Sequence, residues 1–152
     1  MGIQSLEKLV GRWSLDGEWK GTSTYRWAEG KRFLFQDFDI HNGERRHVGL
    51  EVIGHLQPMG AGPSSEIWSR AYFYNSGLTL DYVYEVEGSD LTIWFRHKGS
   101  DNRLKARYSP DGTSFSGAWA WPGGGYAVQG RRLDFSPSER PACGLRRSRL
   151  LT

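Results

Sequence analysis

The sequence has one cysteine, no metal-binding pattern and no long apolar run. Cys143 is the only cysteine among the 152 residues, so an internal disulfide is excluded, and no group of cysteine and histidine has the spacing of a zinc site. No apolar segment approaches the roughly 20 residues of a membrane-spanning helix, and the N-terminus lacks the apolar stretch of a secretion signal. We therefore expect a cytoplasmic protein that is stabilised by packing, with no metal, cofactor or membrane span.

The excess of positive charge is confined to the C-terminal end. The formal net charge is +3, and residues 135–152 contain four arginines and one glutamate, which leaves residues 1–134 neutral. A neutral body argues against binding to nucleic acid, because a phosphate track needs clustered basic side chains. We expect one domain over residues 1–134 and a basic and flexible tail over 135–152, and a homodimer is one option for the assembly.

Turn signals recur along the chain and divide it into short apolar segments. Glycine accounts for 20 of the 152 residues, and the segments between the turns are about 7–10 residues long, which is typical of an antiparallel meander. Apolar residues 3, 6, 9 and 10 predict a short N-terminal helix that covers the base, and we place the loop 58–65 at the mouth. About ten strands favour closure into an all-β, antiparallel up-and-down barrel of 8–10 strands, because closure removes exposed edges. The turn pairs are Asp16-Gly17, Glu29-Gly30, Asn42-Gly43, Ser76-Gly77, Gly88-Ser89, Gly99-Ser100 and Asp111-Gly112.

The alternation of side chains predicts which residues face the interior. In the segments from 78 to 128 the inward positions are rich in side chains with an apolar body and a polar edge, which a dry core rarely uses. We interpret them as the wall of a water-accessible cavity that holds a small molecule. The alternative is that several lie at the barrel ends and contact bulk water. The inward residues of this kind are Tyr82, Tyr84, His97, Tyr108, Trp119 and Trp121.

The segment 65–74 has two possible orientations. If its even positions face inward, Trp68, Arg70 and Tyr72 reach the lumen beside Glu66, and Arg70 recognises a carboxylate through its two-pronged guanidinium. If its odd positions face inward, this segment contributes plain apolar packing and the charges face solvent. We favour the first orientation.

Several motifs resemble those of the calycin superfamily of lipocalin-like barrels, and more closely a bacterial family of small calycin-like proteins of unknown function, with a distant likeness to nitrobindin. In calycins a tryptophan of the first strand packs at the closed end of the barrel against an arginine of the last strand. The resemblance therefore implies that Trp13 contacts Arg131 or Arg132 in a structural cation–π pair. The matching stretches are 9–13, 21–27, 32–36, 49–54, 72–73, 109–117 and 119–126.

The function that we predict is binding of a small hydrophobic or aromatic molecule in the lumen by Trp68, Arg70, Tyr72, Tyr82, Tyr84, His97, Tyr108, Trp119 and Trp121. One alternative is a cyclase or isomerase that folds a hydrophobic substrate in the same lumen, with Glu66 or His97 moving a proton. Haem binding is a second alternative, since nitrobindin holds haem through a histidine. No Gly-x-Ser-x-Gly elbow occurs, which argues against nucleophilic hydrolysis, and a domain with no pocket is a further possibility.

Overall fold

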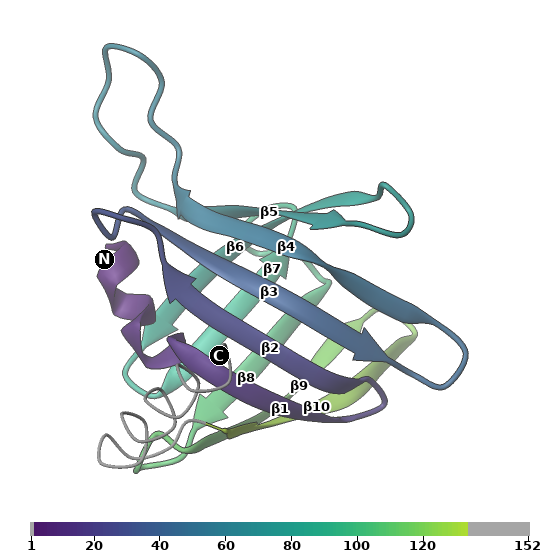
Figure 1. The fold of residues 1–152 in the computed structure, drawn as a ribbon. Coiled ribbons are helices and arrows are strands. Elements are labelled where there is room, and N and C mark those ends of the chain that lie inside the picture. The colour runs from purple at the N-terminus through teal and green to yellow at the C-terminus, as the bar shows by residue number, and fades with distance from the viewer. Residues whose placement is uncertain (1, 134–152) are drawn as a thin grey trace, which may run out of the picture.

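Ten antiparallel strands form a closed barrel with one short helix at its end (Figure 1). The computed structural model describes residues 2–133, so the tail 135–152 and Cys143 lie outside the described residues. The all-β barrel and the N-terminal helix that the sequence predicts are confirmed. The elements are η1 (Ile3–Leu9), β1 (Gly11–Gly17), β2 (Lys20–Trp27), β3 (Phe33–His41), β4 (Arg46–His55), β5 (Ile67–Phe73), β6 (Thr79–Glu87), β7 (Asp90–Phe95), β8 (Arg103–Tyr108), β9 (Ser114–Trp121) and β10 (Gly124–Arg132).

Each strand pairs with its neighbours in sequence, and β1 pairs with β10 to close the sheet. Tight turns make this topology possible: in the β9–β10 turn, Gly123 has φ +88°, a conformation that glycine adopts without steric cost. Closure satisfies the backbone hydrogen-bonding groups of every strand and leaves no edge for another chain to extend. One face of every strand therefore points into the barrel.

The helix η1 closes one end of this barrel. It is a 3-10 helix in which Ile3, Leu6 and Leu9 are buried. Their spacing of three residues matches the three residues per turn of this helix type, so the apolar side chains form one stripe that packs into the barrel. The Ile3 amide donates to His55 Nε2 at the end of β4 over 3.1 Å. No helix in residues 2–133 is long and apolar enough to cross a membrane.

The long loop between β4 and β5 lies at the end that η1 closes, and our expectation that residues 58–65 stand at the mouth is wrong. The loop leaves β4 directly after His55, the residue that contacts η1, and it projects away from the barrel (Figure 1). In an up-and-down barrel every second connection lies at the same end, and β4–β5 shares its end with the N-terminus.

Trp13 lies beneath η1 and is fully buried. Its Nε1 donates to the Leu9 carbonyl over 2.8 Å, and the guanidinium carbon of Arg132 lies 4.3 Å from the centroid of its ring. Arg132 also donates to the Lys8 carbonyl over 2.7 Å. The structure thus places Arg132 against Trp13, whereas Arg131 is exposed on the opposite face of β10.

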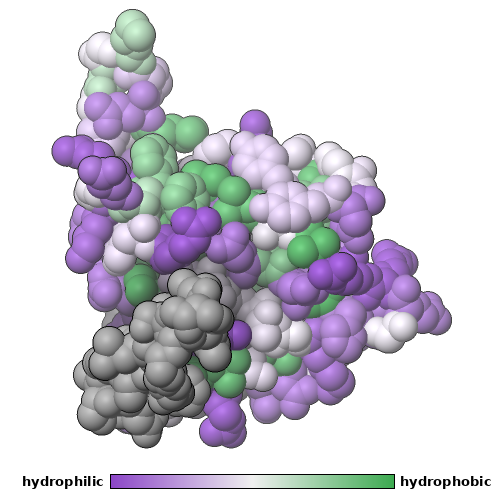
Figure 2. Space-filling view, in the orientation of Figure 1, coloured by the Kyte–Doolittle hydropathy of each residue, from purple (hydrophilic) through white to green (hydrophobic). Residues whose placement is uncertain are grey.

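The outer surface carries its own aromatic and ionic contacts. Val83 interrupts the alternation of β6, yet it is buried because its cross-strand neighbours on this face are Trp68 and Trp94. Figure 2 shows polar and charged side chains interspersed with apolar ones on the face in view. Arginine–aspartate pairs link adjacent strands on the outside of the barrel, and they are Arg26–Asp37, Arg46–Asp39, Arg70–Asp81 and Arg107–Asp90.

Candidate functional site

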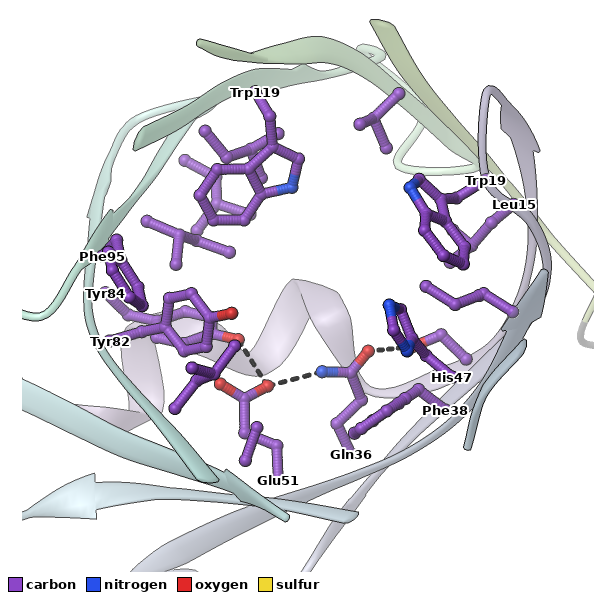
Figure 3. Close-up of a pocket in the computed structure, with 18 of the residues that line it drawn as sticks. Leu15, Trp19, Gln36, Phe38, His47, Glu51, Tyr82, Tyr84, Phe95 and Trp119 are labelled. Carbon is purple, nitrogen blue, oxygen red and sulfur yellow. Dashed lines mark hydrogen bonds between the residues drawn. The ribbon is translucent and has the colours of Figure 1, made fainter. Parts of the chain in front are cut away.

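The interior of the barrel holds a cavity of about 530 Å³. Its wall consists of the inward side chains of the strands, and η1 lies behind it in the view of Figure 3. Apolar and aromatic residues make most of this wall. They include Leu15, Trp19, Phe38, Phe73, Leu80, Tyr82, Leu91, Ile93, Phe95, Leu104, Phe115, Trp119, Trp121, Tyr126 and Val128.

Aromatic side chains surround the cavity at the end opposite η1. Trp19, in the β1–β2 turn, stacks on His47 with 4.4 Å between ring centroids, and His47 meets the Phe73 ring edge-on at 5.1 Å. Trp121 and Tyr126 form a second pair at the β9–β10 turn, with centroids 5.9 Å apart. These two pairs define the mouth.

The deeper wall contains a buried carboxylate. Glu51, on β4, is only 3% exposed. Its Oε1 accepts hydrogen bonds from Gln36 Nε2 over 2.5 Å and from the Tyr84 hydroxyl over 2.8 Å, and its Oε2 accepts one from the Ser69 hydroxyl over 2.6 Å. The Ser23 hydroxyl in turn donates to Gln36 Oε1 over 2.6 Å. We call Ser23, Gln36, Glu51, Ser69 and Tyr84 the polar cluster, of which Figure 3 labels Gln36, Glu51 and Tyr84.

Two opposing effects set the acidity of this cluster. Burial raises the pKa of the Glu51 carboxyl, because the charged form loses its hydration, while the hydrogen bonds from Ser69, Tyr84 and Gln36 act in the opposite direction. Burial is the larger effect. It also raises the pKa of the Tyr84 and Tyr82 hydroxyls, and the nearby Glu51 adds to the rise. Both tyrosines are therefore neutral hydrogen-bond donors at physiological pH.

The raised pKa of Glu51 makes the folding stability depend on pH. Above the unfolded-state pKa of about 4.3 and below the higher folded-state pKa, the folded protein holds a proton that the unfolded chain has released. The free energy of unfolding therefore falls as pH rises through this window. We compare the free energy of unfolding of the wild type with that of Glu51→Gln. We expect the difference, wild type minus variant, to decline above about pH 4.3 and then level off. Urea unfolding at a series of pH values measures this difference, and a constant value from about pH 4 to about pH 8 would contradict a raised pKa.

Part of the predicted ligand-binding set lies at the cavity. Tyr82, Tyr84, Trp119 and Trp121 line it. Tyr108 faces inward as predicted but lies behind Phe115 towards η1, away from the cavity wall, with the Lys8 ammonium 5.6 Å from its ring centroid. It is buried, and its hydroxyl has no hydrogen-bond partner among the residues that the structure describes.

The orientation that we favoured for 65–74 is wrong. The odd positions of β5 are buried, and Ala71 and Phe73 line the cavity. Trp68, Arg70 and Tyr72 face outward, where Arg70 pairs with Asp81 over 2.7 Å and lies over the Trp68 ring. Arg70 therefore does not reach a ligand in the lumen.

His97 is also misplaced by the sequence prediction. The alternation of β7 stops at Phe95, because Arg96 takes a positive φ of 75° and turns the chain. His97 is consequently exposed in the turn before β8. Of the other histidines, His55 contacts η1, His41 is exposed and His47 lines the mouth.

Sequence reasoning missed the polar cluster and the Trp19–His47 pair. For Glu51 a signal existed: it lies on the same strand face as Ile53, so alternation alone places it inside. Within residues 2–133 no group of three histidine, cysteine, aspartate or glutamate side chains has the geometry of a metal site.

No protein-family model matches this sequence, and no curated protein matches it significantly. The closed antiparallel barrel of ten strands is consistent with a calycin or lipocalin-like fold. Such a fold is compatible with ligand binding.

Proposed function

We propose that the barrel binds a small apolar or aromatic molecule in its lumen. The observation that carries the proposal is the cavity of about 530 Å³ with a wall that is mainly apolar and aromatic. Ligand pockets are typically of this size, with a few placed polar groups among hydrophobic side chains. A closed barrel of this kind is compatible with the same function, since lipocalin-like barrels can hold one small ligand in their interior.

Ordinary core packing does not account for the cavity. Protein interiors leave few voids larger than a water molecule, and a filled barrel would use large aliphatic side chains at these positions. Here Tyr82 and Trp119 line the cavity side by side, with 5.9 Å between ring centroids and a tilt of 55° between the rings. Their flat faces suit a planar ligand, since aromatic groups pack in offset or tilted pairs.

The site gives no comparable support to catalysis by the residues that we named. Glu66 and His97 are exposed and do not line the cavity. For haem, the described cavity wall offers one histidine, His47, which stacks on Trp19 and meets the Phe73 ring edge-on. We therefore place binding ahead of both alternatives.

The test is titration of the protein with Nile red, an uncharged dye whose emission rises and shifts to the blue in apolar surroundings. We expect saturable binding that the Val128→Trp substitution abolishes, because Val128 lines the cavity and an indole fills part of it.

The matched control is Ala127→Trp, which introduces the same tryptophan at the preceding residue. Ala127 is exposed, so this variant should bind the dye as the wild type does. Equal dye binding by the wild type and both variants would place the dye elsewhere and contradict the proposal. Circular dichroism establishes that both variants retain the barrel.

A further inference from the structure

We propose that the lumen selects cationic ligands, specifically amines with an aromatic body whose ammonium group donates to Glu51 while the ring packs against Tyr82 and Trp119. This inference rests on the lumen binding proposed above. It adds the charge and the chemical class of the ligand, and it reverses the expectation that an arginine in the lumen recognises a carboxylate.

The first argument is the charge of the cavity wall. Among the described residues that line it, Glu51 is the one carboxylate and none is lysine or arginine. An anionic ligand would meet no lysine or arginine there and would be repelled by the ionised form of Glu51, in a low-dielectric space where charges interact strongly. A cationic ligand would find the opposite charge.

The second argument is the contrast between Glu51 and four aspartates on the outer face of the strands. Asp37, Asp39, Asp81 and Asp90 on the outer surface are each paired with an arginine of a neighbouring strand. Glu51, in contrast, receives hydrogen bonds from neutral groups only, the Gln36 amide and the Ser69 and Tyr84 hydroxyls. Among the described residues, no cationic side chain is paired with this carboxyl group.

The third argument is the remaining hydrogen-bonding capacity at this point. A carboxylate offers about four acceptor positions, and Glu51 uses three of them, two on Oε1 and one on Oε2. Figure 3 shows the carboxylate pointing into the lumen beneath the Tyr82 ring. An ammonium group at Oε2 completes the set with a charge-assisted hydrogen bond, which is stronger than a neutral one.

The aromatic wall suits the same ligand. The faces of Tyr82 and Trp119 carry negative electrostatic potential, so they attract a cation as well as an aromatic ring. Burial of the Glu51 carboxyl raises its pKa, and a bound ammonium group favours the ionised form of that carboxyl. The ion pair and the apolar wall thus act on the two ends of one molecule.

The experiment compares three ligands of similar shape by isothermal titration calorimetry: naphthylethylamine, uncharged propylnaphthalene and naphthylacetate. We expect the amine to bind about tenfold or more tightly than the uncharged compound, as one charge-assisted hydrogen bond predicts, and naphthylacetate to bind more weakly than both. Glu51→Gln removes the charge but keeps an acceptor oxygen, so the ratio of amine to uncharged affinity should fall to about one.

The matched control is Glu87→Gln, which removes an exposed carboxylate from β6. The amine preference should persist in this variant, and its loss there would overturn the inference by assigning the preference to general surface charge. If propylnaphthalene binds and Val128→Trp blocks it, but the wild type shows no amine preference, the inference fails and the proposed function stands. If neither Nile red nor any of the three compounds binds, both fail.

Discussion

Replacing Glu51 with leucine is expected to lower the free energy of unfolding by about 3–6 kcal/mol, because it leaves several buried donors without an acceptor, each at a cost of about 1–3 kcal/mol. The affected donors are the Gln36 amide and the Ser69 and Tyr84 hydroxyls, all of which donate to Glu51. Leucine is apolar and similar in size, so the loss arises from the hydrogen bonds and not from a cavity.

Glu51→Gln is the matched control for this prediction. Its amide oxygen accepts as one carboxylate oxygen does, and its NH2 group can donate to the Ser69 hydroxyl, so the expected change is within about 1 kcal/mol at neutral pH. Urea unfolding followed by tryptophan fluorescence measures both variants. If leucine and glutamine at position 51 gave equal stability, the polar cluster would not contribute to stability in the way described.

Replacing Trp13 with alanine is expected to lower the free energy of unfolding by about 3–5 kcal/mol, the usual cost of removing a fully buried large side chain. Trp13 is 0% exposed and contacts three different partners: the Leu9 carbonyl, the Arg132 guanidinium and the Phe115 ring, whose centroid lies 5.0 Å away. Its loss also removes the hydrogen bond to the Leu9 carbonyl, which is one of the contacts that hold η1 on the barrel. Thermal unfolding measures the effect as a lower melting temperature.

The contribution of the Trp13–Arg132 pair can be separated by a double-mutant cycle. Arg132→Met keeps the aliphatic stem, and combined with Trp13→Phe it should show a coupling of about 0.5–2 kcal/mol. Arg131→Met is the control, since Arg131 is exposed on the other face of β10, and its coupling to Trp13 should be close to zero. Equal coupling at both positions would contradict the specific contact.

Much of the barrel could be predicted from the sequence because closure depends on local rules. Turn pairs divide the chain, and the alternation in β6 and β9 places Tyr82, Tyr84 and Trp119 inside, although Val83 interrupts the pattern in β6. β5 also alternates, but the sequence does not decide which of its faces points inward, because both faces carry large aromatic or apolar side chains. Trp68 and Tyr72 look like interior residues, yet they cover the outside of the sheet.

The rest of the site depends on features that alternation does not encode. A single residue with positive φ, Arg96, ends the pattern of β7 and moves His97 outside. The alternation of β4 alone places Glu51 on the inward face, but a carboxylate is rarely buried without a partner. Its partners Gln36, Ser69 and Tyr84 come from three other strands. Only the register of the closed sheet brings them together.

In the described part of the chain, η1 and Trp13 cover one end of the barrel, and the mouth lies at the other end. A ligand that enters through the mouth passes Trp19 and His47 on one side and Trp121 and Tyr126 on the other, whereas the carboxyl group that we propose to bind an amine lies deeper, at Glu51. The rate at which a ligand leaves therefore depends on residues at the mouth, whereas the preference for one ligand over another depends on residues deeper in the barrel. Substitutions at the mouth can therefore change the rates of ligand entry and release without changing which ligand the interior prefers.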